Sequence, residues 1–145
     1  MTLPAALRNV LDTFALVDDP VDRANLLIGY ADQFKAVPPE IAAPPYPRSH
    51  QVPYCESDAY VWLVPHADGT ATLHFAVENP SGVSAKALAS ILQSTLSGQP
   101  LEAIEQVSPD IVEQIFRQNI SMGKGMGLMA LVQAVQALAR RARQR

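Results

Sequence analysis

Hydrophobic residues recur every three to four positions over the first part of the chain, a period typical of amphipathic helices. One stripe follows Pro4 and a second follows the "VDDP" break, where Asp19 can cap a helix and Pro20 can begin it. The first stripe contains Leu7, Val10, Leu11 and Phe14, and the second contains Leu27, Tyr30, Ala31 and Phe34. The pattern predicts a helical hairpin.

Residues 59–65 and 70–77 are rich in β-branched and aromatic side chains and predict two strands. Asp68-Gly69, between them, is a hairpin turn signal. Alternation within the second strand assigns its residues to two faces. One predicted face, taken as polar, has Thr72, His74 and Ala76, and the other has Leu73, Phe75 and Val77.

Helical periodicity returns after the strands. We expect a helix over residues 85–97, with Ser84 as its N-cap and Gly98 at its C-terminal end. Two short helical pieces should meet at Ser108-Pro109. A last helix is predicted from the stripe Leu128, Leu131, Val132, Val135, Leu138 and Ala142.

The glycine-rich "NISMGKGMG" before this last helix is interpreted as a turn. An anion cradle is the alternative, but the glycine spacing matches neither a Walker loop nor a dinucleotide-binding fingerprint. A docking role for Lys124 also stays open.

The order of elements predicts an α+β fold, with helices packed on one face of a small antiparallel sheet. Six of the twelve prolines fall within residues 37–53 and predict a stiff, extended loop that lies across the fold. A length of 145 residues is that of one domain, so we expect residues 1–145 to form a single unit.

Composition narrows the choice of partners and compartment. A net charge of −3 argues against nucleic acid as a partner. The cations Arg140, Arg141, Arg143 and Arg145 are interpreted as a solvated helix end, or as a weak docking surface. No apolar run is long enough to cross a membrane, and the first residues do not resemble a signal peptide. With a single cysteine, the expected location is the cytoplasm.

Candidate chemistry centres on that cysteine, Cys55. The scattered Cys, His and carboxylate residues lack the paired spacing of a zinc site. A dyad of Cys55 with His50 would need a geometry that sequence proximity does not ensure. Composition alone favours an inert, buried thiol, whereas the position at the end of a proline-rich loop favours a functional one. Glu56 and Asp58 would disfavour a thiolate, so Arg48, His50 or a partner would have to compensate. In a loop able to swing out, the thiol could rest near Tyr54 or Trp62.

The segments "VPYCES", "YVWL", "DGTATLHF", "ALASILQSTLSGQPLEAI" and "GMGLMALVQAVQALA" together resemble the SufE family over roughly residues 7–139. The resemblance implies an α+β fold like that of IscU-type scaffolds, with the cysteine at a loop tip. It also implies a sulfur acceptor that takes a persulfide sulfur from a pyridoxal-phosphate-dependent cysteine desulfurase and passes it to an iron–sulfur scaffold. Such a protein stimulates the desulfurase as an accessory and needs no cofactor or metal of its own. Cys55 matches the family's essential cysteine, and Ser57 the small hydroxyl residue two positions later.

Two departures from the family pattern concern partner recognition. Tyr54 stands where many members have glycine, and "ESDAY" is a longer spacer before the Val-Trp pair. Lys124 replaces an arginine and loses its planar, bidentate group. The residues expected to contact a partner are Tyr54, Glu56, Ser57, Asp58 and Lys124.

Two other interpretations stay open. One is an interaction module that regulates a partner and uses Cys55 structurally. The other is a scaffold for nascent clusters, which would need more ligands than one cysteine.

Overall fold

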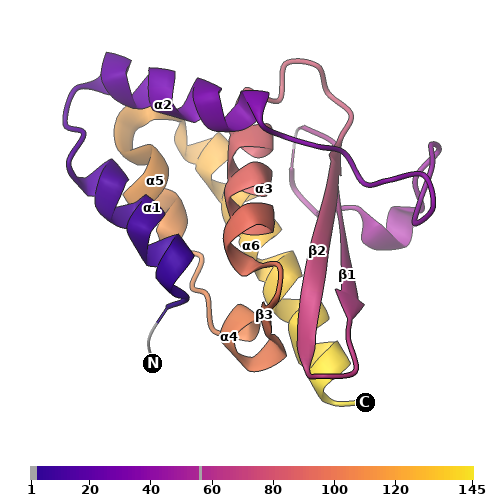
Figure 1. Cartoon of the computed structure of the whole chain (residues 1–145). Helices are drawn as coiled ribbons and strands as arrows, with labels where there is room; N and C mark the ends of the chain where they lie inside the picture. Colours follow the sequence, from indigo (N-terminus) through magenta and orange to yellow (C-terminus); the bar gives the residue numbers. More distant parts are fainter. Residues whose placement is uncertain (1–2, 56) are drawn as a thin grey trace.

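The computed structural model describes residues 3–55 and 57–145, beginning with two helices (Figure 1). Helix α1 spans Ala5–Ala15 and α2 spans Pro20–Asp32. The Asp19 carboxylate accepts the N–H groups of Val21 and Asp22 at 2.7 and 3.2 Å, so the predicted cap is confirmed. Phe34 was expected within the second helix but lies just beyond its end.

The predicted hairpin has the expected bounds, β1 over Ala59–Pro65 and β2 over Thr70–Val77. The strands are antiparallel, with Ala59 opposite Val77. Gly69 occupies the turn with φ of 86°, a conformation that glycine adopts without steric cost. A third strand that sequence reasoning missed, β3 over Gln99–Pro100, pairs with the start of β2.

Helices cover one face of this sheet, as predicted. Helix α3 (Val83–Leu96) contacts β2, and α6 (Met122–Arg143) contacts β1. Leu73 and Phe75 of β2 are buried on this face in the main core. Helix α3 begins earlier than predicted, because Gly82 rather than Ser84 is its N-cap. Gly98 follows its end with φ of 87°, as a helix-terminating glycine should.

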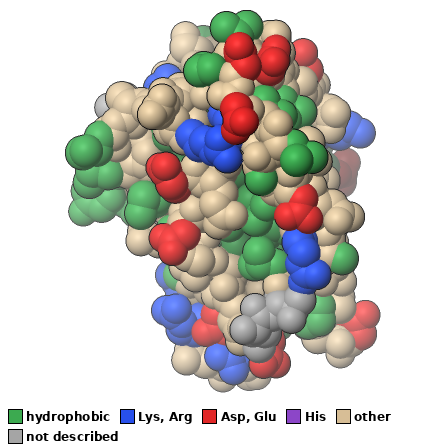
Figure 2. Space-filling model, turned by 90° about the vertical axis from the view of Figure 1, so that its left-hand side faces the viewer, with side chains coloured by type: hydrophobic (Ala, Val, Ile, Leu, Met, Phe, Trp, Pro, Cys, Tyr) green, Lys and Arg blue, Asp and Glu red, His purple; other side chains and the backbone are tan. Residues whose placement is uncertain are grey.

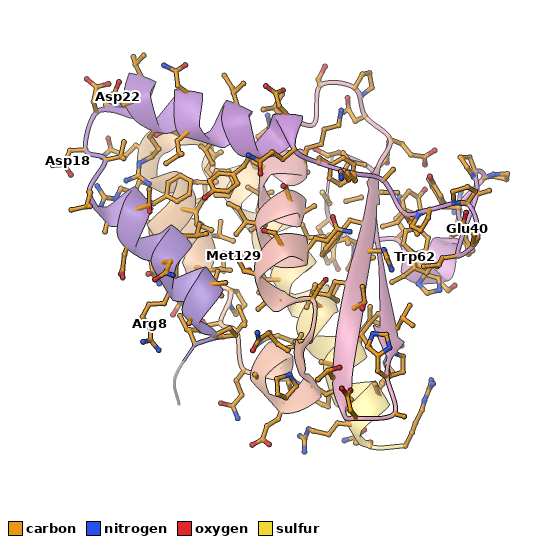
Figure 3. The ribbon with its side chains drawn as sticks, viewed as in Figure 1. Arg8, Asp18, Asp22, Glu40, Trp62 and Met129 are labelled. Atoms are coloured by element: carbon orange, nitrogen blue, oxygen red, sulfur yellow. The ribbon has the colours of Figure 1, made fainter. Side chains whose placement is uncertain are left out.

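The proline-rich segment covers the opposite face and includes the short 3₁₀ helix η1 (Arg48–His50). The Val37 N–H bonds the Phe75 carbonyl at 2.8 Å, and the Val52 N–H bonds the Ala59 carbonyl at 2.8 Å. Trp62 is buried between β1 and this loop, and Glu40 lies far out along it (Figure 3). The face expected to be polar is therefore covered.

His74 on that covered face is half-buried, and its Nδ1 lacks a hydrogen-bond partner among the described residues. Burial lowers the pKa of His74, so the neutral ring is favoured there.

Two short helices, α4 (Leu101–Glu105) and α5 (Ile111–Phe116), connect β3 to η2 (Arg117–Asn119). The Ser108 hydroxyl accepts the Asp110 N–H at 3.1 Å, so it caps the turn that leads into α5. Glu105 binds Arg140 at 3.2 Å and Arg143 at 2.6 Å. These two arginines therefore attach the end of α6 to α4 instead of being merely solvated.

A buried arginine joins the ends of α1 and α5. Arg23 is 1% exposed, although it lies on a helix whose other polar residues mostly face solvent.

The surface over α1 and α5 mixes hydrophobic, acidic and basic side chains (Figure 2). Across the described residues, no helix combines the length and apolarity needed to cross a membrane.

Candidate functional site

Cys55 lies in a short loop between η1 and β1 that is attached to the sheet at both ends. The Val52 N–H bonds the Ala59 carbonyl, and the Glu78 N–H bonds the Asp58 carbonyl at 3.1 Å. Within the loop, the Asp58 N–H reaches the Cys55 carbonyl at 3.3 Å. The hairpin therefore fixes the loop's two ends and leaves the thiol between them.

The backbone is in the left-handed region on both sides of the cysteine. Tyr54 has φ of 64° and Asp58 has φ of 51°. For residues other than glycine this conformation costs about 1 to 3 kcal/mol each, and it persists only where surrounding contacts enforce it. Such local strain is concentrated at functional sites, and two of the three described non-glycine residues with positive φ flank Cys55, the third being Arg117 after α5.

The thiol is half-buried and packs against the main core. Beside it is a cavity of about 10 Å³, which is close to the smallest space that holds one water molecule. The cavity is lined by Cys55, Ser57, Ser84, Ala85, Gly123, Lys124, Gly127 and Leu128.

This lining is cationic in character. Ser84 and Ala85 belong to the first turn of α3, and Gly123 and Lys124 belong to the first turn of α6. Helix N-termini carry partial positive charge, and the lysine adds a full one. A negatively charged sulfur species would interact favourably with these groups.

An open hollow of about 540 Å³ lies on the loop's other side. Its lining comprises Arg48, Gln51, Val52, Pro53, Tyr54 and Cys55. Cys55 therefore lies between the small cavity and a hollow open to solvent, through which a partner's reactive group could approach.

Arg48 and Asp58, one of the two acidic residues expected to disfavour a thiolate, both lie near Tyr60. The pKa of Tyr60 is raised chiefly by a hydrogen bond to Glu78, and burial of the hydroxyl raises it further. The charge of Asp58 raises this pKa further and that of Arg48 lowers it, so both charges lie near the tyrosine hydroxyl. Arg48 therefore offsets part of the negative charge at the Tyr60 hydroxyl, and its effect on the Cys55 thiol stays a prediction.

The structure places most of the predicted site residues around the thiol. Ser57 and Lys124 line the small cavity with Cys55, although they are 67 positions apart in the chain. Tyr54 is 87% exposed and borders the open hollow, and Asp58 is exposed at the loop's end. Glu56 lies outside the described residues.

The glycine-rich segment before the last helix was predicted as a turn, and that prediction is wrong. Helix α6 begins at Met122, and the Ser121 hydroxyl accepts the Lys124 N–H at 3.2 Å as an N-cap. Lys124 therefore occupies the helix's first turn, where its backbone is fixed and its side chain is exposed.

His50 is not arranged as a base for the cysteine. Its Nδ1 lies 2.9 Å from the Val61 carbonyl, and its ring stacks on Trp62 at 5.1 Å between centroids. Of the two residues expected near the resting thiol, Tyr54 borders the open hollow with Cys55. Trp62 instead packs in the separate cluster under the proline-rich loop, and the small cavity beside the thiol is formed with α3 and α6.

Sequence reasoning missed Ser84 and two glycines, Gly82 and Gly127, which approach the loop closely. No periodic pattern marks a glycine that contacts a distant loop, so the signal is visible only in three dimensions. Among the described residues, no group of three His, Cys, Asp or Glu side chains could hold a metal ion.

Fold and site together define a small α+β protein with one thiol on a loop between a hairpin and the first turns of two helices. A family model described as SufE, the Fe-S metabolism associated domain, matches residues 8–139. The chain belongs to this SufE family and so has a role in Fe-S metabolism.

The structure is similar to the solution structure of a hypothetical protein from Thermus thermophilus, with a TM-score of 0.77 and 24% identity. The match covers 99% of this chain and 100% of that chain. At this identity the likeness shows the fold alone. Among curated proteins, no relative matches the sequence.

Proposed function

We propose that this chain is a single SufE-like domain that carries sulfur in Fe-S metabolism, with Cys55 as the residue that holds it. The observation that carries the proposal is the position of Cys55, half-buried between a small cationic cavity and an open hollow. A thiol that receives an atom from another protein needs access on one side and a place for the received atom on the other.

The transfer is chemically balanced without a cofactor. The Cys55 thiolate attacks the outer sulfur of the donor's persulfide, which forms a new S–S bond and breaks the donor's own S–S bond. The donor cysteine leaves as a thiolate, and the transferred sulfur keeps its proton and its oxidation level. One accessible cysteine on this chain is sufficient, and with no second cysteine the persulfide cannot collapse into an internal disulfide.

The expected partners follow from that chemistry. The donor is a pyridoxal-phosphate-dependent cysteine desulfurase, which this chain stimulates by removing its persulfide, and the recipient is an iron–sulfur scaffold protein. Tyr54, Ser57, Asp58 and Lys124, together with Glu56, are proposed to contact the donor around Cys55. The proposed compartment is the cytoplasm, where thiols stay reduced.

Mass spectrometry of the chain after incubation with a cysteine desulfurase and cysteine tests the proposal. The expected result is a gain of one sulfur atom, which is lost on reduction and absent in Cys55→Ser. No adduct with any cognate desulfurase would overturn the proposal. If Cys55→Ala preserved all cellular activity, the chain would instead be an interaction module.

A further inference from the structure

The helix beneath the cysteine loop touches the loop backbone at a glycine. A Cβ atom added at Gly127 of α6 would lie 3.0 Å from the Tyr54 carbonyl oxygen and 3.3 Å from the Cys55 Cα. Both distances are shorter than ordinary van der Waals contact. Because the contacted atoms are backbone, no side-chain rotation can relieve the overlap. With a side chain at residue 127, the loop backbone would have to move by a few tenths of an ångström from its resting position.

A second glycine, Gly82 at the N-cap of α3, also lies beside this loop. A Cβ at Gly82 would lie 2.9 Å from the Val77 Cγ1, 3.0 Å from the Ser57 Cβ and 3.1 Å from the Asn79 carbonyl oxygen. Other helical glycines differ, since Gly29 and Gly123 have nothing within 4 Å and Gly125 has one side-chain atom at 3.5 Å. Close contact with the backbone of the loop is therefore a property of Gly127 among the helical glycines, whereas Gly82 meets the loop at the Ser57 side chain.

The loop that rests on these glycines is strained at both sides of Cys55. Tyr54 and Asp58 both have positive φ, and the Tyr54 side chain is 87% exposed, so its own contacts cannot hold that conformation. Backbone hydrogen bonds at the loop's ends, the packing of Cys55 against the core and the contact between the Tyr54 backbone and α6 hold it together. A substitution that pushes the loop off α6 should release the strained conformation and uncover the thiol.

We propose that Gly127 is a positioning residue that holds the Cys55 loop against α6 and thereby sets how far the thiol is exposed before a partner binds. Its role deepens the proposed sulfur-carrier function and rests on it. The resting contact shields Cys55 and its persulfide, and partner binding lifts the loop away from Gly127. A side chain at residue 127 would thus displace the loop from its shielded position.

Alkylation of Cys55 in the intact chain tests this role without any desulfurase. Rates are measured with small iodoacetamide and with a bulky maleimide across a range of pH. In Gly127→Ala, we expect the maleimide rate to rise about ten-fold and the iodoacetamide rate to rise less, because the overlap destabilises the resting loop. Gly125→Ala on the same helix gains equal helix propensity and is expected to leave both rates unchanged.

The ratio of the two rates separates positioning from a merely structural role. A change in thiol acidity would shift the pH profiles of both reagents equally, and a loss of fold would appear in circular dichroism and in the melting temperature. If Gly127→Ala disturbs folding, Gly82→Ala provides the second test of loop release. Equal maleimide-to-iodoacetamide ratios in the wild type, Gly127→Ala and Gly125→Ala would overturn the proposal.

Persulfide loading distinguishes this proposal from the function on which it rests. In Gly127→Ala, the persulfide formed with a desulfurase should be removed by dithiothreitol about ten-fold faster than in the wild type, since shielding is lost. A wild-type chain that never becomes loaded contradicts the sulfur-carrier function, whatever the alkylation rates are. A chain that loads normally but has equal removal rates in both variants contradicts the role of Gly127 alone.

Discussion

Replacing the buried Arg23 by methionine should destabilise the fold by an amount that the structure allows us to work out. The Arg23 guanidinium donates to the carbonyls of Phe14 and Val17 at the end of α1 and to those of Gln114 and Ile115 in α5. Its Cζ also lies 5.4 Å from the centroid of the Phe14 ring. Methionine keeps much of the side-chain volume but leaves these carbonyls without their donor.

Two of the four hydrogen bonds are fully buried, those to Phe14 and Ile115. A buried acceptor that loses its partner costs about 1 to 3 kcal/mol. Burial lowers the pKa of Arg23, which shows that the buried charge carries a desolvation penalty. Removing the guanidinium removes this penalty and offsets part of the loss. The net expectation is a loss of about 3 kcal/mol in the free energy of unfolding, which corresponds to a fall of about 10 °C in melting temperature.

Urea denaturation, followed by circular dichroism and by the fluorescence of Trp62, measures this loss. Arg8→Met is the matched control, because Arg8 is exposed and makes one hydrogen bond, to the Leu3 carbonyl. Its change should stay below about 0.5 kcal/mol. Arg23→Lys should be intermediate, since one ammonium cannot reach both helix ends. An Arg23→Met variant within about 1 kcal/mol of the wild type would refute the reasoning.

Three further predictions concern docking, pH and the hairpin. Lys124→Ala should raise the KM for the desulfurase about three-fold with little change in kcat, because an exposed interfacial charge acts mainly on association, and an unchanged KM would remove Lys124 from the docking surface. Lys35→Ala is the control. Hydrogen bonds from Arg143 and Arg140 lower the pKa of Glu105 below its ordinary value of 4.5. The ionised Glu105 carboxylate therefore stabilises the fold above pH 4.5, and this stabilisation is lost as the pH falls through the pKa of Glu105 in the folded state. The difference in urea midpoint between the wild type and Glu105→Gln should therefore shrink on acidification, and an equal difference at neutral pH and about pH 3 would contradict it. Gly69→Ala should cost about 1 kcal/mol because of its φ of 86°, and an unchanged urea midpoint would count against this.

The elements that sequence could predict are those whose own residues determine them. The stripe from Leu7 to Phe14 and the Asp19 cap determine the first two helices locally, and the Asp68-Gly69 turn with its alternating neighbours determines the hairpin. Cys55 could also be identified as the candidate residue from the sequence, because it is the single cysteine of the chain and the segments around it resemble the SufE family.

The features that sequence could not predict depend on contacts between distant segments. Arginine is usually a surface residue, and Arg23 is buried only because the ends of α1 and α5 meet around its guanidinium. Three glycines in "GKGMG" favour a turn by propensity, yet the Ser121 cap and packing at Leu128 make the segment helical. His74 was assigned to a polar face because nothing in an alternating strand reveals that a loop will cover it.

The reach of the thiol is limited by where its loop is attached. Helix α6 is held along its length by buried residues such as Leu131 and by the ion pairs of Glu105, so the surface beneath the loop is rigid. Backbone hydrogen bonds fix Val52, Ser57 and Asp58, so the segment that could lift lies between Val52 and Ser57. At about 3.5 Å per residue, the tip of such a segment can rise roughly 10 Å from its anchors. A donor's persulfide must therefore come within that distance of this face, so close surface contact around the loop is needed even when the loop is fully extended.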